Sequence, residues 1–316
     1  MSAGYPLVSV GMPVYNGERH LREALDSLLG QDYPNVEIVI ADNASTDGTA
    51  AICAAYAARD ARVRYVRHET NRGIAWNFNR VFALSRGEYF MWAACDNVLA
   101  PSLLRKCIDA LEGHRDASLC HAQCGFISED GRPLGGPHAN YEATGVDVRA
   151  RWKRVLNARA YPAWYTAIYG VIRASCLRRT GLVRAVWGAD QLLVAELSLQ
   201  GPLLQVPELL WWLRHHDDAT EPESIYQTVM GKLDPWRPRR ARRWTQFGMH
   251  REYIRVALRA PCAPRTRYRL AADVAANYVM ARGWLSDLDE CGWAGAPLRW
   301  VRTMRRRATR PCRSET

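Results

Sequence analysis

The sequence lacks the features that would place its 316 residues in a membrane or a secreted class. No apolar run reaches the ~18 residues that a membrane span requires. The amino-terminal MSAGYPLVSV has no charged region followed by a long apolar one, so no secretory signal is expected. The nine cysteines include no CxxC pair. Scattered cysteines favour reduced thiols, and we therefore expect a cytoplasmic protein.

The sequence has fewer acidic than basic residues: 32 Asp and Glu compared with 43 Lys and Arg, which gives a net charge of +11. The basic excess gathers at residues 237–269 and in RTMRRRATRPCR near the end. One interpretation is a solvated basic face, and the other is attraction to phosphate. The sequence contains no nucleic-acid recognition motif, so a nucleic-acid partner is not expected. Apolar residues from Trp293 to Met304 fit an amphipathic helix at the inner face of a membrane, a self-packed helix or the arm of a homodimer.

What the sequence does contain is an alternation of strand-like and helix-like segments. Hydrophobic residues make up 48%, enough for a sizeable core. A strand is predicted at 7–15, followed by a helix that Gly30 can end and a β-branched strand at 36–40. The alternation continues to a fourth strand, which we expect to end at Asp96. This pattern predicts an α/β fold with a mostly parallel sheet flanked by helices.

After about residue 113 the pattern changes. A hairpin-like turn is predicted at 129–131, and a helix of about ten residues is predicted to follow Asp190. From about residue 225 the sequence is helical and basic. We therefore predict a catalytic domain at residues 1–220 and a basic, mostly helical carboxyl-terminal extension at 221–316.

Acids stand where the parallel strands are predicted to end. Asp42 follows the second strand and Asp96 follows the fourth, while the polar turn of Tyr15 and Asn16 follows the first. Ligands of open parallel sheets bind at the carboxyl ends of strands. The sequence therefore predicts a ligand site at this edge.

Five segments, taken in order over residues 7–216, resemble the family 2 glycosyltransferases of the GT-A, Rossmann-like fold. They are VSVGMPVYNGERHLREALDSLL, VEIVIADNASTDGT, NRGIAWNFN, ACDN followed by Pro101, and GADQLLVAELSLQG. The resemblance implies an inverting transfer of a sugar from a UDP- or dTDP-type donor to an acceptor hydroxyl, with Mg²⁺ or Mn²⁺, in glycan, glycolipid or natural-product biosynthesis. A lipid-linked acceptor would suit the basic carboxyl terminus. The last hundred residues are not covered.

The resemblance also assigns donor contacts. Asp42 corresponds to the acid that contacts the base, and its alternative role is to cap the following turn. The turn at 71–73 suits a phosphate, because helix-terminal N–H groups and an arginine meet there. Its alternative is an ordinary surface turn, and the alternative for Tyr15 is plain core. The full set of implied donor contacts is Pro13, Tyr15, Asn16, Glu18, Asp42, Asn71, Arg72, Gly73, Asn77 and Asp96.

Asp96 resembles the last carboxylate of the family's acidic metal-binding motif. Ala94 and Cys95 occupy the positions where relatives carry further acids. One carboxylate suffices for Mg²⁺ or Mn²⁺ if the donor diphosphate supplies other oxygens. His216 is the second implied metal ligand. The alternatives are a helix N-cap for Asp96 and a solvated loop histidine for His216.

Asp190 resembles the catalytic base, at a helix start that favours its anionic form. Its alternative is again an N-cap. Because the acidic motif is thin, the alternative for the whole protein is a catalytically impaired protein that binds nucleotide sugars or acts as a scaffold. The presence of Asp190 argues against it, since a pure binder needs no base.

Overall fold

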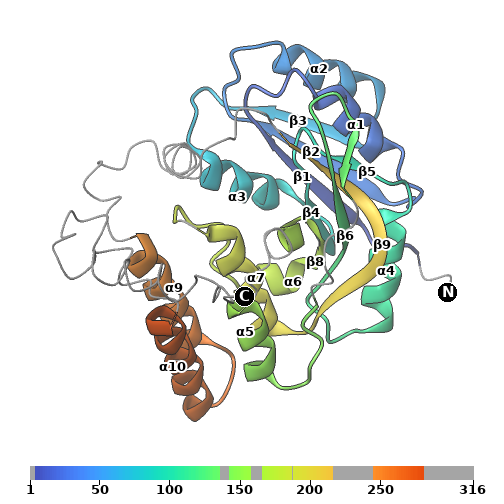
Figure 1. Ribbon diagram of the computed structural model, residues 1–316. Coiled ribbons are helices and arrows are strands. Elements are labelled where there is room, and N and C mark those ends of the chain that lie inside the picture. Colours follow the sequence, from blue (N-terminus) through green and yellow to red (C-terminus); the bar gives the residue numbers. More distant parts are fainter. Residues whose placement is uncertain (1–3, 136–141, 158–165, 187, 216–244, 281–316) are drawn as a thin grey trace, which may run out of the picture.

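Nine strands form one mixed sheet in the part of the chain that the computed structural model describes, residues 4–135, 142–157, 166–186, 188–215 and 245–280 (Figure 1). The spatial order is β3-β2-β1-β4-β8-β6-β9-β5, with β7 paired to β6. The strands are β1 (Val8–Val14), β2 (Val36–Asp42), β3 (Val63–Arg67), β4 (Tyr89–Trp92), β5 (Val98–Leu99), β6 (Leu119–Ile127), β7 (Pro133–Gly135), β8 (Val171–Arg173) and β9 (Leu203–Arg214).

The amino-terminal half of the sheet is parallel, as the alternation predicts. β1 pairs in parallel with β2 and β4, and β2 with β3. The register sets Val14 beside Asp42, and Asp42 beside Arg67. These three strands therefore end at one edge. β8 joins β4 in the antiparallel direction and opens the mixed half, where β6 and β9 are parallel.

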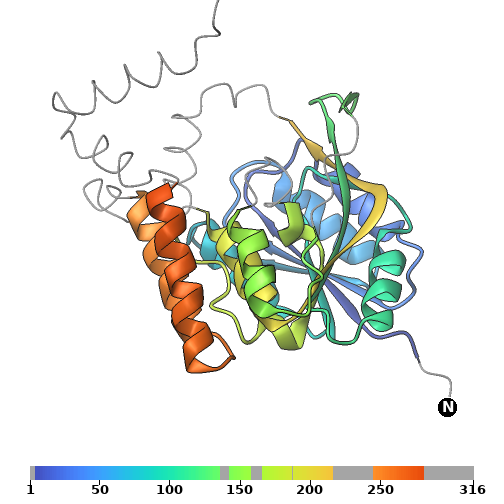
Figure 2. The ribbon, with the colours of Figure 1, turned by 60° about the horizontal axis from the view of Figure 1, so that its bottom comes forward.

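Helices cover both faces of the sheet (Figures 1 and 2). One hydrophobic core lies under α1 (Leu21–Leu29), α2 (Thr49–Arg59) and α4 (Leu103–Gly113). The second core lies under α3 (Ile74–Leu84), α5 (Val148–Leu156), α6 (Ala174–Leu177) and α7 (Ala189–Gln200). In α1 the predicted helical spacing is confirmed: Leu21, Ala24, Leu25 and Leu28 are buried, and Gly30 is the C-cap.

The second core also takes in the helical carboxyl-terminal part, α9 (Thr245–Arg259) and α10 (Pro264–Met280). Trp152 of α5 donates a hydrogen bond through Nε1 to the carbonyl of Leu270, and Arg149 pairs with Asp273 at 2.7 Å. The division at residue 220 stays a prediction, because 216–244 lie outside the described residues. So do residues 281–316, which include the basic segment from Trp293 to Met304. In the described ranges, no helix combines the length and the apolar character of a membrane span.

One predicted boundary is wrong. β4 ends at Trp92, so the strand stops before it reaches Asp96. The amide of Ala93 donates to the carbonyl of Gly11, and the chain then turns at residues 95–96 before β5 pairs with β9. Asp96 therefore lies in a turn, where its backbone has no partner strand to hold it.

A buried polar network ties the amino ends of the central strands. Ser9 on β1 donates through Oγ to Glu37 on β2 at 2.5 Å, and the backbone amide of Arg86 donates to the same carboxylate at 2.7 Å. The Arg86 guanidinium completes the set at 3.0 Å. Burial would raise the pKa of Glu37, but the hydrogen bonds from Ser9 and Arg86 outweigh it and hold the pKa below its usual value.

We expect Glu37→Gln to lower the free energy of unfolding by about 1–3 kcal/mol at pH 7, because the charged hydrogen bonds are lost. A depressed carboxyl pKa contributes stability above the unfolded pKa and loses it as pH falls through the folded pKa. The variant should therefore show less loss of stability below pH ~4.5 than the parent. Urea unfolding at several pH values measures both effects. Glu142→Gln, on an exposed side chain, is the matched control, and equal effects of the two changes would contradict the role of this network.

Candidate active site

The loop that follows β1 is held against the loop that follows β2. Asn16 has a left-handed backbone with a φ of 52°, and its amide donates to Ser45 Oγ at 2.9 Å. Its side-chain Oδ1 accepts from the amide of Thr46 at 2.8 Å. The amide of Gly17 donates to Thr49 Oγ1 at 2.9 Å. These contacts use the Asn16 side chain to shape the edge rather than leaving it free for a ligand.

The Glu18 side chain also holds the loop that follows β2. Its Oε2 accepts from the amide of Gly48 at 2.8 Å, and a Cβ at Gly48 would lie 2.5 Å from that carboxylate. Glycine at 48 is therefore required for this close approach. Tyr15, in contrast, is 48% exposed at the end of β1, and Pro13 is half-buried. The interpretation of Tyr15 as plain core is therefore wrong, and its ring is accessible at the edge.

Asp42 is fully buried at the end of β2. One carboxylate oxygen accepts from the amide of Ser45 at 2.8 Å, and the other accepts from the Tyr65 hydroxyl at 2.9 Å. Arg67 Nε lies 3.6 Å away. One oxygen of Asp42 therefore caps the following turn, as the alternative interpretation predicts. A contact with a nucleotide base stays a prediction; each carboxylate oxygen has a second lone pair that could accept from the base.

Asn43, which the sequence interpretation did not single out, ties β2 to the turn before α3. It is 2% exposed. Its Nδ2 donates to Asn71 Oδ1 at 2.8 Å, and its Oδ1 accepts from the amide of Arg72 at 2.9 Å. Gly73 has a φ of 85°, which glycine adopts readily. The turn at 71–73 is therefore braced from inside and is not an ordinary surface turn.

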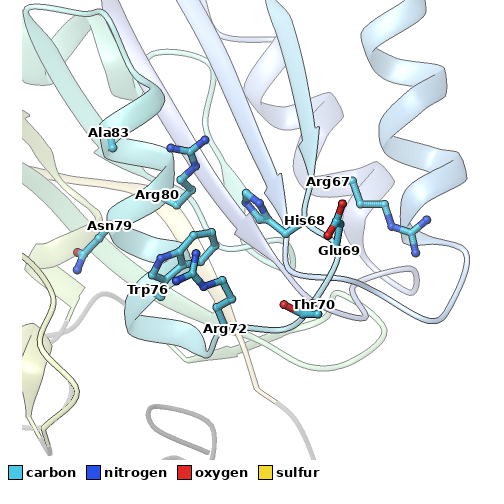
Figure 3. A pocket seen from close by; sticks show the side chains of 9 residues that line it. All are labelled: Arg67, His68, Glu69, Thr70, Arg72, Trp76, Asn79, Arg80 and Ala83. Carbon is cyan, nitrogen blue, oxygen red and sulfur yellow. The ribbon is translucent and has the colours of Figure 1, made fainter.

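Two further predicted donor contacts, Asn77 and Arg72, already have contacts within the protein. Asn77 is 3% exposed and donates to the carbonyls of Ala41 at 2.9 Å and Val14 at 3.4 Å, so it braces the ends of β2 and β1 from within. The Arg72 guanidinium lies 4.3 Å from the centre of the Trp76 ring, along α3 (Figure 3). Asn77 is therefore a bracing residue of the interior, whereas Arg72 is exposed, and a donor contact by either one stays a prediction.

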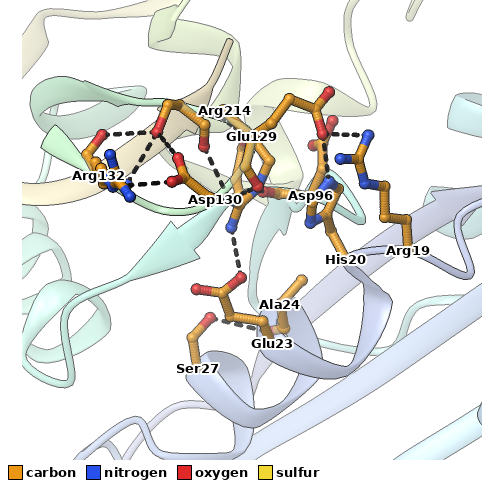
Figure 4. A network of polar contacts seen from close by, with 12 residues as sticks. Arg19, His20, Glu23, Ala24, Ser27, Asp96, Glu129, Asp130, Arg132 and Arg214 are labelled. Atoms are coloured by element: carbon orange, nitrogen blue, oxygen red, sulfur yellow. Dashed lines mark hydrogen bonds and ion pairs between the residues drawn. The ribbon is translucent and has the colours of Figure 1, made fainter. Parts of the chain in front are cut away.

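The turn that carries Asp96 is held by Arg214, another residue that sequence reasoning missed (Figure 4). The Arg214 side chain is 1% exposed. Its Nε donates to the Asp96 carbonyl at 3.1 Å, and its Nη1 donates to the carbonyls of Ser128 at 3.0 Å and Glu129 at 2.9 Å. Its Nη2 pairs with Glu23 of α1 at 2.5 Å. One guanidinium thus joins the Asp96 turn, the β6–β7 hairpin and α1.

The signal for Arg214 was present in the sequence as a cation that ends a long apolar strand, LLQVPELLWWLR. A buried arginine at such a position needs several acceptors, but the sequence does not say which. His215 follows, and its amide donates to the Ile127 carbonyl at 2.7 Å. His216, the second predicted metal ligand, lies outside the described residues.

Asp190 lies in the first turn of α7. The N-cap of this helix is Gly188, which has a φ of 67°, so the N-cap interpretation of Asp190 is wrong. The N-cap of α4 is Ser102, which likewise excludes that role for Asp96. Asp190 Oδ1 accepts from the amide of Gln191 at 2.8 Å. Burial raises the pKa of Asp190, because a carboxylate loses hydration there.

Tyr169, on the 3₁₀ turn η1 (Thr166–Tyr169), connects the two acids electrostatically. Burial raises its pKa, and the negative charges of Asp96 and then Asp190 raise it further. Asp96 and Asp190, which are 94 residues apart in the sequence, therefore act on the same phenol. The ring of Tyr169 packs against Trp211, with 5.6 Å between the ring centres. No sequence pattern indicated this residue.

The described residues around Asp96 offer few ligands for a metal ion. No group of three or more His, Cys, Asp or Glu side chains that could hold an ion occurs within the described ranges. Burial, followed by the charge of Asp96, raises the pKa of Cys95 to about 12, so its thiol stays protonated near neutral pH and does not replace the missing acid. The donor set fits a hard cation that arrives with diphosphate oxygens, not a cation held by the protein alone.

The parallel half-sheet, the acids near its carboxyl edge and the mixed second half define a glycosyltransferase of the GT-A-like class. The chain belongs to glycosyl transferase family 2, whose sequence model matches residues 9–187. It is similar to the putative glycosyltransferase EpsE of Bacillus subtilis, with 39% identity over 36% of this chain and 41% of EpsE. Glycosyltransferase GlyG of Streptococcus pneumoniae is 34% identical over 31% of this chain and 33% of GlyG. The chain thus spans less than half the length of these relatives.

Two solved structures share the fold at low sequence identity. The S. aureus TarS 1-349 complex with UDP-GlcNAc has a TM-score of 0.61 at 18% identity, covering 89% of this chain and 79% of that one. The mannosyltransferase PcManGT from Pyrobaculum calidifontis, in complex with GDP-Man and Mn²⁺, has a TM-score of 0.54 at 18% identity, covering 96% and 80%. Both confirm the predicted fold class.

We expect Arg214→Met to lower the free energy of unfolding by about 3 kcal/mol, because three partly buried carbonyls and one carboxylate lose their donor. Glu23→Gln is the matched control: its side chain is 51% exposed, and the carbonyl contacts survive. That change should cost less than about 1 kcal/mol. Urea denaturation compares the two variants. A larger cost for Glu23→Gln than for Arg214→Met would show that the ion pair, not the carbonyl contacts, dominates.

Proposed function

We propose that this protein is an inverting glycosyltransferase that moves a sugar from a nucleotide-diphosphate donor to an acceptor hydroxyl, with Asp190 as the general base. The observation that carries the proposal is the place of Asp190 in the first turn of α7, where burial raises its pKa. A general base works best when its pKa approaches the operating pH. Family membership supports the reaction class.

The donor is a UDP- or dTDP-type sugar in this proposal. Tyr15 offers an exposed ring at the end of β1 for the base. The amides of Arg72 and Gly73 donate to Asn43 and Asn71, so the diphosphate would meet the amides of the first turn of α3 instead. Solved neighbours of this fold contain UDP-GlcNAc and GDP-Man, which supports a nucleotide-sugar donor and leaves the base to experiment.

The reaction places different demands on the two acids. The acceptor hydroxyl attacks the anomeric carbon from the face opposite the diphosphate, and Asp190 takes its proton as the new C–O bond forms. The bond from the sugar to the diphosphate breaks, and its electron pair leaves with the phosphate oxygen. A divalent cation held between Asp96 and the diphosphate would neutralise the charge that develops there. Arg214 fixes the Asp96 backbone from which that carboxylate projects.

The first test is a donor panel. Purified protein is incubated with UDP-, dTDP- and GDP-sugars, in Mn²⁺ and in chelator, and calorimetry measures binding while nucleotide release measures turnover. We expect one nucleotide class to bind, and to bind more tightly with Mn²⁺. The absence of binding to every donor by folded protein contradicts the proposal. Binding without turnover under any acceptor identifies the scaffold alternative.

The second test separates the two acids. Asp190→Asn should reduce kcat by about 10²–10⁴ while donor affinity stays near that of the parent, because the base acts on the acceptor. Asp96→Asn should instead weaken donor binding in Mn²⁺ and change it little in chelator. An active Asp190→Asn variant would rule out its role as the base.

Asp190 should also reduce stability. Its folded pKa is raised, so folding favours the protonated form and stability falls as pH rises through the unfolded and then the folded pKa. At pH 7 the charged carboxylate therefore destabilises the fold, and Asp190→Asn should raise the unfolding midpoint. In the parent, kcat/KM should fall as pH is lowered through a value above ~3.9, the ordinary pKa of an aspartate. A lower midpoint for the variant would contradict the assignment.

A further inference from the structure

We propose that the groove between the end of β3 and α3 binds a phosphate group. It begins at Arg72, one of the predicted donor contacts, and extends along α3 to Arg80 and Ala83. The groove has a volume of about 690 Å³ and is open to solvent (Figure 3). It is lined by Arg67, His68, Glu69, Thr70, Arg72, Trp76, Asn79, Arg80 and Ala83. The proposal does not depend on the glycosyltransferase function.

The groove leads away from the strand ends where the acids converge. Its α3 lining, Trp76, Asn79, Arg80 and Ala83, repeats every three or four residues, so these side chains share one side of the helix. From Trp76 to Ala83 the helix rises by ~10 Å, since each residue adds ~1.5 Å. Neither Asp96 nor Asp190 contributes to the lining. The far end of the groove is therefore remote from the predicted chemistry.

The charge of the lining is strongly positive. Arg72 and Arg80 have no carboxylate partner among the described side chains, while Arg67 lies 3.6 Å from Asp42. Glu69 is the single acid of the lining. Burial lowers the pKa of His68, and the charges of Arg80 and Arg72 lower it further. An anion in the groove would offset a positive potential that the described protein leaves uncompensated.

Hydrogen-bonding groups without partners cluster at the same place. His68 Nε2 and Arg80 Nε are buried and have no partner, and Arg64 Nε on β3 is in the same situation. A buried donor without an acceptor costs about 1–3 kcal/mol, so such groups are uncommon in proteins. Five buried side-chain atoms lack a hydrogen-bond partner in the described part of the chain, and two of them, on His68 and Arg80, belong to residues that line the groove. Oxygen atoms of a bound anion would satisfy them.

Trp76 restrains two side chains of the lining, Arg72 and His68. The Arg72 guanidinium lies 4.3 Å from its ring centre, and the His68 ring meets it edge-on at 4.6 Å with an interplanar angle of 81°. Figure 3 shows the indole between Arg72 and Arg80, with His68 across the groove. Stacking restrains a guanidinium before any ligand binds, which lowers the entropy cost of binding.

A phosphate group fits this donor set. Guanidinium groups bind phosphate oxygens through charge-assisted hydrogen bonds, and an imidazole can add a further donor. The volume falls in the range of sites for whole small ligands, ~300–1,000 Å³, so there is room for a group attached to the phosphate. The source of the phosphate is either a soluble phosphate ester or the headgroup of an anionic lipid.

The experiment uses the full chain and inorganic pyrophosphate, titrated by calorimetry in chelator so that no metal–diphosphate complex forms at Asp96. We expect the parent to bind. Arg80→Gln should weaken the affinity by about tenfold or more, since it removes a charged donor. Arg59→Gln is the matched control: it makes the same charge change on exposed α2, where Arg59 pairs with Asp26. Its affinity should equal that of the parent.

Further variants guard against loss of the fold. Arg80→Lys keeps the charge but not the planar guanidinium, and it should bind with intermediate affinity. His68→Gln should weaken binding without a change in formal charge at high pH. Circular dichroism verifies that each variant is folded. The proposal is wrong if the parent gives a flat isotherm, or if Arg80→Gln and Arg80→Lys both bind like Arg59→Gln.

Vesicle sedimentation identifies the source of the phosphate. Phosphatidylglycerol–phosphatidylcholine vesicles are compared with pure phosphatidylcholine. Arg80-dependent binding to the anionic vesicles, inhibited by pyrophosphate, assigns the groove to a lipid headgroup. The other outcome is that the parent binds pyrophosphate but Arg80→Gln leaves vesicle binding unchanged. That outcome assigns the groove to a soluble phosphate ester.

Discussion

The parallel register of β1 with β2 and β4 is the constraint on which the rest of the structure depends, because it brings their ends to one edge. Register alone fixes only the strands. The loops beyond them are held by buried side chains that donate to or accept from backbone groups, chiefly Asn43, Asn77 and Arg214. Each joins segments that are far apart in the sequence. The candidate site is therefore as rigid as these few polar contacts make it.

The sequence was sufficient to predict the strand–helix order and the edge where polar residues gather, because hydrophobic periodicity is a local property. It did not separate residues that shape the edge from those that face solvent. Asp42 and Asn16 have the polar groups of ligand contacts, yet Ser45, Tyr65 and Thr46 occupy them. Arg214 and Tyr169 escaped notice for the same reason: their roles depend on partners brought together only by the fold.

The thin acidic motif makes the position of Asp96 more important. Burial raises the pKa of Cys95, and Ala94 offers no ligand, so in the proposed reaction Asp96 would meet a cation that brings most of its other ligands with it. With no second acid beside it, Asp96 depends on its own backbone for its position. The four acceptors that surround the Arg214 guanidinium restrict the turn from which Asp96 projects. In this interpretation, rigidity of the backbone compensates for the shortage of acids.

Charge is distributed unevenly between the two ends of the parallel strands. At the amino ends, Glu37 accepts enough hydrogen bonds to lower its pKa, so its charge stabilises the fold. In the first turn of α7, burial raises the pKa of Asp190, and no cation among the described residues offsets this. A base that gave its charge to a salt bridge would be a weaker proton acceptor. In the proposed reaction, the raised pKa that destabilises the folded protein at Asp190 is the property that would suit this residue to proton transfer. The network around Glu37 would supply part of the stability that this arrangement requires.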